Sequence, residues 1–205
     1  MTKLVIQIPC YNEENTLLTT LRDLPTKVDG FDEVEILIIN DGSTDNSREI
    51  ALDFGAKVFD IKPNKGLANA FRSGLQECLR LGADVIVNTD ADNQYFAKDI
   101  DKLTSPILNG QADIVVGARN ISGIKDFSLL KKFLQKIGSA VLRMLSATKV
   151  EDAPSGFRAF SREAALKLNV FDNYTYTMET LVQAGAKDLR VLSVPIGVNS
   201  KLRES

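Results

Sequence analysis

The sequence predicts an α/β fold in which a mostly parallel central sheet is covered by helices. Short runs rich in β-branched residues alternate with longer helical patterns through the first two thirds of the chain. These runs are apolar almost throughout, which is typical of strands that are buried on both faces of a sheet. Polar clusters follow the runs one after another. Strands separated by helices in this way favour parallel pairing with helices packed on both faces.

Five strands are expected in the first part of the chain, and helix-start chemistry lies between them. The expected strands are residues 3–9, 34–40, 56–61, 83–89 and 112–118. We expect one helix within residues 12–24 and a second within residues 43–55. In the second segment, Ser43 or Thr44 is a suitable N-cap and Gly55 is a suitable C-cap.

Length and charge limit the classes of function. A chain of 205 residues fits one ordinary domain. The 25 Lys and Arg residues nearly balance the 27 Asp and Glu residues, for a formal net charge of −2. We therefore expect no nucleic acid as a partner. The chain has no histidine, which excludes imidazole as a general base, a phosphate carrier or a metal ligand.

Cysteine content and hydropathy favour a cytoplasmic protein. Cys10 and Cys78 are the only cysteines, too few for a disulfide scaffold and without the spacing of a zinc site. The apolar run near the N-terminus is too short for a secretory signal, and no stretch approaches the roughly 18–20 apolar residues of a membrane-spanning helix. Any membrane contact is expected at the cytoplasmic face.

A polar cluster follows each expected strand. In chain order the clusters read PCYNEE, NDGSTD, PNKG, DADNQ and GARN. Turn and cap chemistry alone would account for a single cluster of this kind. Ligands of parallel α/β sheets bind outside the carboxyl ends of the strands. Five successive clusters therefore predict one crevice at that edge.

Asp90 and Asp92 lie two positions apart at the end of the fourth expected strand. Residues i and i+2 of an extended chain point to the same side, so these carboxylates and Gln94 would converge if the extended geometry continued. Two close carboxylates repel each other unless a cation lies between them. Oxygen ligands suit Mg²⁺ or Mn²⁺, which also bind the phosphates of a substrate.

Other interpretations of the acidic pair stay open at this point. An EF-hand loop that begins at Asp90 would have an acid at its twelfth position, but Tyr95 stands where glycine is needed. A phosphotransferase could use Asp90 as a nucleophile and Asp92 as its acid or base. Asp92 or Asn93 could also cap a helix that begins near Phe96.

Taken in order, the motifs resemble those of family-2 inverting glycosyltransferases of GT-A type, most closely the dolichol-phosphate mannose synthase-like, polyprenyl-phosphate branch. The segments that carry the resemblance read IPCYNEEN, INDGSTDNS, NKGLANAFRSGL, DADNQ, DAPSGFRAFSREAAL, ETLVQA and VPIGVNSK. The resemblance implies a Rossmann-like nucleotide-diphospho-sugar transferase fold that forms one catalytic domain over residues 1–205. Residues 1–118 would bind the nucleotide sugar, and residues 119–205 would bind the acceptor.

The resemblance also implies the residues that bind the donor. They are Pro9, Tyr11, Asn12, Glu13, Asp41, Asn64, Gly66, Asp90, Asp92 and Arg119. An acceptor-rich pocket suits the N–H edge of uracil or guanine. Asp92 and Gln94 are the implied ligands of Mg²⁺ or Mn²⁺, which would stabilise charge on the departing diphosphate. Asp90 is expected to contact the donor, and the planar guanidinium of Arg119 suits phosphate.

The acceptor decides whether a catalytic base is needed. Transfer to a hydroxyl needs a base, and in a chain without histidine that base would be a carboxylate, for which we expect Asp152. A lipid phosphate is already ionised, so its oxygen can attack without a base if cations bring the two anions together. Asp92, Arg119 and Asp152 are thus the expected catalytic residues, with Asp152 a structural or acceptor-site residue if the acceptor is a phosphate.

Residues 120–149 predict a basic amphipathic helix. Apolar residues at helical spacing fall on one face and basic residues on the other, and the segment has an excess of five positive charges. Such a surface suits anionic lipid headgroups, so we expect peripheral membrane contact there. An amphipathic helix packed on the sheet with a solvated basic face remains the alternative.

The sequence thus predicts a metal-dependent inverting glycosyltransferase. It would move a hexose from GDP-mannose or a UDP-hexose to a polyprenyl or dolichyl phosphate. One alternative keeps this donor and uses a saccharide hydroxyl as the acceptor. A second is a nucleotidyltransferase, although the first strand is not followed by the Gly-rich basic loop expected of that class. A binding module without catalysis is the third.

Overall fold

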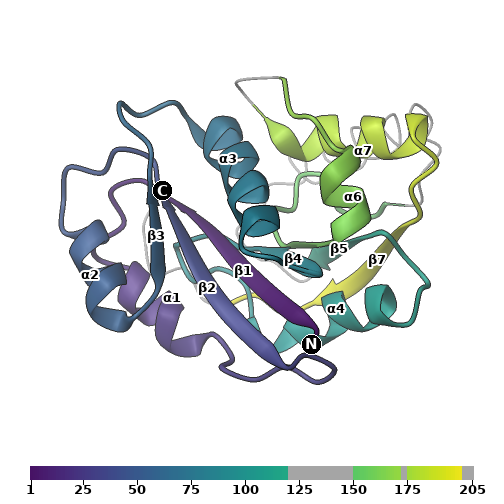
Figure 1. Cartoon of the computed structure of the whole chain (residues 1–205), viewed down its shortest axis with the longest axis horizontal. Coiled ribbons are helices and arrows are strands. Elements are labelled where there is room, and N and C mark those ends of the chain that lie inside the picture. The colour runs from purple at the N-terminus through teal and green to yellow at the C-terminus, as the bar shows by residue number, and fades with distance from the viewer. Residues whose placement is uncertain (120–149, 172–174, 200–205) are drawn as a thin grey trace, which may run out of the picture.

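The computed structural model describes residues 1–119, 150–171 and 175–199. These residues form one seven-stranded sheet in the order β3-β2-β1-β4-β6-β5-β7 (Figure 1). The strands are β1 (Lys3–Cys10), β2 (Glu33–Asn40), β3 (Lys57–Asp60), β4 (Val85–Asn88), β5 (Ile114–Arg119), β6 (Arg158–Ser161) and β7 (Val191–Ile196). The helices are α1 (Leu17–Asp23), α2 (Ser47–Phe54), α3 (Leu67–Arg80), the 3₁₀ helix η1 (Ala97–Asp99), α4 (Ile100–Leu108), α6 (Arg162–Lys167) and α7 (Tyr176–Ala186).

The sheet is mostly parallel, which confirms the predicted fold class. β1 pairs in parallel with β2 and β4, β2 with β3, and β5 with β7. β6 alone runs antiparallel, between β4 and β5. The five expected strands included neither β6 nor β7. β6 was missed because its four residues begin with a charged arginine and do not read as an apolar run.

Helices cover both faces of the sheet, so the strands are apolar along their length. On β1, Val5 packs with residues of α3, α6 and α7. Its neighbours Leu4 and Ile6 pack on the opposite face with residues of α1 and α4. Alternate side chains of one strand thus enter two separate cores, each of which removes apolar surface from water.

Two expected helices begin later than predicted. α1 begins at Leu17 and α2 begins at Ser47, with Asn46 in the N-cap position. Ser43 and Thr44 do not cap α2, because Ser43 Oγ accepts a hydrogen bond from the backbone of Asn12 and Thr44 donates its backbone N–H to the Asn12 side chain. The predicted C-cap of this helix is confirmed, because Gly55 ends α2 in the left-handed conformation, with φ 91°.

The carboxyl ends of β1, β2, β3 and β4 lie next to one another, and this edge of the sheet positions the site. Cys10 of β1 is level with Asn40 of β2, and Asn40 is level with Asp60 of β3. β4 ends earlier, with Asn88 opposite Gln7. The shorter β4 leaves room for the acidic segment that follows it.

Two further predictions concern membranes. No helix among the described residues is both long enough and apolar enough to cross a bilayer. The basic amphipathic helix expected within residues 120–149 lies outside the described residues.

Candidate active site

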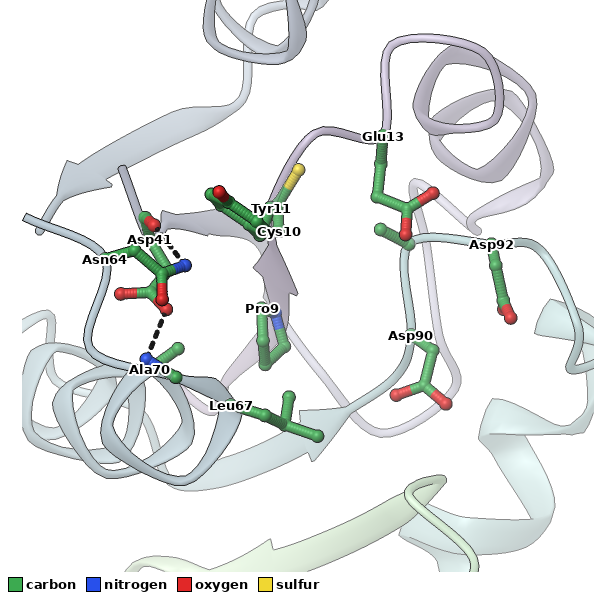
Figure 2. Close-up of a pocket in the computed structure, with 12 residues that line it drawn as sticks. Pro9, Cys10, Tyr11, Glu13, Asp41, Asn64, Leu67, Ala70, Asp90 and Asp92 are labelled. Carbon is green, nitrogen blue, oxygen red and sulfur yellow. Dashed lines mark hydrogen bonds between the residues drawn. The ribbon is translucent and has the colours of Figure 1, made fainter. Parts of the chain in front are cut away.

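A pocket of about 420 Å³ opens at the carboxyl ends of the first four strands (Figure 2). Four of the five polar clusters contribute to it, whereas none of the described residues of the fifth, GARN, which include Arg119, lines it. Its lining consists of Pro9, Cys10, Tyr11, Glu13, Asp41, Asn64, Gly66, Leu67, Ala70, Asp90, Ala91 and Asp92. The volume is within the range of sites that hold small ligands.

Asp41 fixes one side of the pocket through its own hydrogen bonds. Its side chain is 3% exposed, and Oδ1 accepts the backbone N–H of Lys65 at 2.9 Å while Oδ2 accepts that of Gly66 at 2.8 Å. The backbone oxygen of Asp41 accepts a hydrogen bond from Asn64 Nδ2 at 2.9 Å. Gly66 has φ 87°, which favours glycine at this turn into α3. Asp41 therefore holds the segment that was expected to approach the nucleotide.

The first loop is placed by Asn12, which is not among the residues that line the pocket. The side-chain oxygen of Asn12 accepts a hydrogen bond from the backbone N–H of Thr44 at 2.8 Å. The backbone N–H of Asn12 donates to Ser43 Oγ at 3.1 Å. In the same loop, Glu13 donates its backbone N–H to Ser47 Oγ at 2.8 Å. These contacts hold Tyr11 and Glu13 at the pocket (Figure 2).

Carboxylates gather on the opposite side of the pocket from Asp41. Figure 2 shows Glu13, Asp90 and Asp92 on that side. Burial, followed by the charge of Asp92, raises the pKa of Asp90 to about 6, and the charge of Glu13 acts in the same direction. Arg119 and a hydrogen bond with Tyr95 oppose this shift. This side of the pocket therefore has an excess of negative charge that a cation would relieve.

The acidic segment is a turn and does not continue the strand. β4 ends at Asn88, and Asn93 has φ 56°. Asp92 Oδ1 accepts the backbone N–H of Gln94 at 3.0 Å. Neither Asp92 nor Asn93 caps the following helix, because the N-cap of η1 is Phe96. The condition of continued extended geometry is therefore not met, and a turn brings Asp90 and Asp92 to the same side of the pocket instead.

The side-chain atoms available as metal ligands on the acidic side fit a hard divalent cation only in part. They are oxygen atoms, which Mg²⁺ and Mn²⁺ prefer. Within the described ranges, no three Asp, Glu or Cys side chains are grouped so as to hold a metal by themselves. Gln94 is not among the residues that line the pocket, and its backbone oxygen accepts the backbone N–H of Asn199 at 2.8 Å. A cation here would need further oxygen ligands, such as phosphate or water.

Arg119 and Asp152 form a buried ion pair next to the acidic side. Arg119 Nε donates to Asp152 Oδ2 at 2.7 Å, and Arg119 Nη2 donates to Oδ1 at 3.0 Å. The side chain of Asp152 is 1% exposed and that of Arg119 is 15% exposed. Burial lowers the pKa of Arg119, but the pair with Asp152 outweighs it, so the net pKa is raised. The arginine is held in one orientation as a permanent cation.

Tyr95 and residues 153–158 are functional candidates to which sequence reasoning assigned no role. Tyr95 and Gly156 lie beside Asp90, and Arg158 lies beneath the segment, fully buried. The motif SGFR was visible as part of the resemblance, but its contacts with the acidic segment depend on the pairing of β4 with the antiparallel β6. No local pattern in the sequence indicates that pairing.

Comparison with known proteins places these features in a family context. A sequence profile described as Glycosyl transferase family 2 matches residues 5–168. The UDP-N-acetylglucosamine–dolichyl-phosphate N-acetylglucosaminyltransferase of Methanococcus voltae is 33% identical over 211 residues, covering 92% of this chain and 82% of that protein. The undecaprenyl-phosphate mannosyltransferase of Micrococcus luteus is 27% identical over 210 residues, covering 97% of this chain and 84% of that protein.

The fold has close counterparts among solved structures. The glucosyl-3-phosphoglycerate synthase of Mycobacterium tuberculosis, solved with Mn²⁺, UDP and glucosyl-3-phosphoglycerate, matches with a TM-score of 0.78 at 21% identity. The match covers 100% of this chain and 73% of that one. At this identity the likeness shows the fold alone, and it confirms the predicted GT-A architecture.

Proposed function

The chain belongs to glycosyl transferase family 2 and is a glycosyltransferase, and we propose that it transfers a hexose, with inversion, from a nucleoside diphosphate sugar to a polyprenyl phosphate. Relatives at 27% and 33% identity bear names that specify undecaprenyl phosphate and dolichyl phosphate. These names support a lipid phosphate acceptor for this chain. The hexose and the base stay open between GDP-mannose and a UDP-hexose.

The state of Asp152 is the observation that carries the choice of acceptor. A hydroxyl acceptor needs a general base within reach of its proton. Both oxygens of Asp152 accept hydrogen bonds from Arg119, and the carboxylate is buried. Arg119 therefore occupies the two oxygens that would have to take up the proton of a hydroxyl acceptor. A phosphate acceptor needs no base, so the ion pair favours the lipid phosphate and gives Asp152 the role of orienting Arg119.

Donor binding is proposed for the residues of the pocket and the loop beside it. From the lining they are Pro9, Tyr11, Glu13, Asp41, Asn64, Gly66, Asp90 and Asp92, and from the loop beside it Asn12. Arg119 is also proposed; it lies outside the lining, and its charge acts on Asp90. Tyr11 is 49% exposed and presents its ring to the pocket, where a base could pack on it. The oxygens of Asp41 retain lone pairs beyond those used by the two backbone N–H groups, so they can also accept an N–H of the base.

Asp92 and Gln94 are proposed to hold Mg²⁺ or Mn²⁺ together with the donor diphosphate. The excess of carboxylate charge on this side of the pocket supports a cation. A divalent metal would supply Lewis-acid stabilisation of the charge on the leaving diphosphate. The structure of the glucosyl-3-phosphoglycerate synthase, which has a similar fold, contains Mn²⁺. Asp90, which stands on the same side, is proposed to contact the sugar of the donor.

The proposed reaction is a single displacement. The oxygen of the acceptor phosphate attacks the anomeric carbon, and the bond from that carbon to the diphosphate breaks on the opposite face. Arg119 stabilises the approach of the two anions, because its planar guanidinium binds phosphate oxygens in pairs. Asp152 keeps the guanidinium oriented before substrate binds, which lowers the cost of ordering it.

Incubation with labelled UDP-glucose or GDP-mannose, Mn²⁺ and either polyprenyl phosphate or a soluble saccharide tests the acceptor. We expect label in the organic phase only with polyprenyl phosphate. Label confined to the aqueous phase as a saccharide product would overturn the lipid acceptor. Asp92→Ala is the matched negative control, because it removes the proposed metal ligand and should abolish metal-dependent transfer.

A further inference from the structure

The backbone of Gly156 is held by hydrogen bonds at both its N–H and its carbonyl oxygen. Its N–H donates to the hydroxyl of Tyr95 at 3.2 Å, and its carbonyl oxygen accepts a hydrogen bond from Asn88 Nδ2 at 2.8 Å. Asn88 is fully buried and Tyr95 is 5% exposed. Because both partners are held in the core, the backbone of Gly156 has little freedom to shift.

A side chain at position 156 would meet the acidic segment. A Cβ atom placed on Gly156 would lie 3.0 Å from Asp90 Oδ1 and 3.3 Å from Asp90 Oδ2. It would also lie 3.0 Å from the hydroxyl of Tyr176. The backbone of Gly156 is outside the left-handed region, so alanine is disfavoured there by contact and not by conformation. Glycine at this position therefore leaves free the space that a methyl group would take from Asp90 and Tyr176.

Asp90 is the neighbour that would have to move. The ring of Tyr176 stacks on Phe71 with centroids 3.8 Å apart, and its hydroxyl accepts a hydrogen bond from Asn88 at 3.1 Å. Tyr176 is 1% exposed and has no space to shift. The carboxylate of Asp90 instead borders the pocket and can rotate into free space. An added methyl group would push it toward the ligand space.

The segment that carries Gly156 cannot withdraw, because Arg158 anchors it from below. The guanidinium of Arg158 is fully buried and donates to the carbonyl oxygens of Ala153 at 2.5 Å and Ser155 at 2.8 Å. It also donates to Thr177 O and Thr180 Oγ1 of α7, each at 2.8 Å. A buried cation satisfied in this way rigidifies the groups around it.

We propose that Gly156 is a positioning residue, whose missing side chain sets where the carboxylate of Asp90 lies and so how the enzyme holds the sugar of its donor. The inference rests on the proposed function, in which Asp90 contacts that sugar. The same short segment places Arg119 through Asp152 at its other end. Residues 152–158 thus align the donor side and the acceptor side of the site.

Gly156→Ala tests the proposal because its effect on binding of the donor sugar can be measured separately from its effect on binding of the nucleotide. We expect the affinities for UDP and GDP with Mn²⁺, measured by calorimetry, to stay within about twofold of the parent, because Asp41 and Asp92 are untouched. The affinity that UDP-glucose has beyond that of UDP, or GDP-mannose beyond that of GDP, should be lost. Turnover should fall about tenfold, since a shift of a fraction of an ångström in a substrate contact has effects of that order.

Gly117→Ala is the matched control. A Cβ on Gly117 would lie 2.9 Å from Ile196 Cδ1 and 3.1 Å from the backbone oxygen of Phe157, contacts as tight as those at Gly156. It would therefore press on the same segment but would meet no carboxylate. We expect it to cost similar stability and to leave the ratio of nucleotide-sugar to nucleotide affinity unchanged. Tyr95→Phe adds no bulk and removes the hydroxyl that accepts the Gly156 N–H. The same hydroxyl also hydrogen-bonds Asp90, so this change releases both Gly156 and the carboxylate. It should lower the additional affinity for the nucleotide sugar even if Gly156→Ala does not fold.

A double-mutant cycle with Asp90→Asn decides whether Gly156 acts through Asp90. Non-additive effects on turnover are expected, because two changes that act through one contact do not sum. Additive effects, or an equal loss of affinity for nucleotide and nucleotide sugar, would overturn the inference and leave the proposed function intact. A parent protein that binds neither UDP-glucose nor GDP-mannose would overturn both.

Discussion

At the scale of single residues, two buried carboxylates act by holding other groups in place. Asp41 accepts two backbone N–H groups from the turn that begins α3. Asp152 accepts both a side-chain fork and the backbone N–H of Arg119, the latter at 3.2 Å. Hydrogen bonds from N–H groups to an ionised acceptor are stronger than neutral ones. The two aspartates therefore fix parts of the site before any ligand binds.

Asp41→Asn should loosen the turn at residues 64–66 in the absence of nucleotide. The amide nitrogen of asparagine cannot accept the N–H that Asp41 Oδ1 or Oδ2 now accepts, so one backbone donor loses its partner. The free energy of unfolding should fall by about 2 kcal/mol. Amide exchange at residues 64–67 should become faster, and nucleotide affinity should fall for UDP and GDP alike.

Asp60→Asn provides the comparison for Asp41→Asn. Asp60 is exposed at the end of β3 and accepts hydrogen bonds from Asn40 and Arg48 outside the pocket. Its change should cost less than about 1 kcal/mol, because exposed ion pairs contribute little. If Asp41→Asn left exchange at residues 64–67 unchanged and altered only the preference between UDP and GDP, Asp41 would act solely on the base.

Asp152→Asn distinguishes a positioning carboxylate from a catalytic base. An asparagine can accept one N–H of Arg119 but no longer neutralises it, so the guanidinium should lose its fixed orientation. We expect turnover with polyprenyl phosphate to fall about 10- to 100-fold, with nucleotide affinity unchanged and the pH dependence of turnover unaltered. Loss of a pH-dependent limb, measured over pH 5–9, would instead identify Asp152 as the base.

Which residues line the pocket was largely predictable, but their partners were not. Pro9, Tyr11, Glu13 and Asp41 follow strands whose carboxyl ends must meet in a parallel sheet, so their convergence follows from topology. The pairing of Asp152 with Arg119 depends on packing between segments far apart in sequence. Asn12 was expected at the ligand because of its motif, but nothing in the motif indicated that its side chain also joins two loops.

At the scale of elements, the antiparallel β6 decides the geometry between the two halves of the site. β6 pairs with β4 on one side and with β5 on the other. It thereby places the segment before it, residues 152–157, between the ends of the strands that carry Asp90 and Arg119. A four-residue strand has too little pattern to be predicted, and its position reflects long-range pairing rather than local propensity.

Asp113 and Arg190 join β5 to the start of β7, and their pair predicts a pH-dependent contribution to stability. Arg190 donates to Asp113 through its backbone N–H at 2.8 Å and through Nε and Nη2 at 3.0 and 2.8 Å. This hydrogen bonding holds the pKa of Asp113 below its ordinary value. The unfolded chain therefore takes up the proton first as the pH falls.

Asp113→Asn should lower the free energy of unfolding by about 1 kcal/mol at pH 7, a figure discounted for the 57% exposure of Arg190. The stabilisation by Asp113 is complete above the ordinary carboxyl pKa and is lost as the pH falls through the lowered one. Urea unfolding at pH 7 and pH 3 should therefore show the difference shrinking in acid. A difference that grows in acid would contradict the ion pair as its source.

At the scale of the whole molecule, the site exists only in the folded chain. Its lining comes from loops after β1, β2, β3 and β4, which meet because the strands are packed side by side in one sheet. The unfolded chain has no such surface. A ligand of the pocket therefore binds the native state alone and stabilises the entire fold by RT ln(1 + L/Kd), where L is the free ligand concentration.

This linkage predicts which donor and which metal the site takes. At a concentration of 100 times its dissociation constant, the correct nucleotide sugar should raise the melting temperature by roughly 5–10 °C. The shift should need Mn²⁺ or Mg²⁺ and should disappear with EDTA, because the excess negative charge beside Asp90 and Asp92 would otherwise repel the diphosphate. A thermal-shift panel of UDP- and GDP-sugars measures both preferences. Asp92→Ala should lose the metal-dependent part of the shift, while Asp113→Asn should keep it; an equal shift in EDTA would point to binding without a metal.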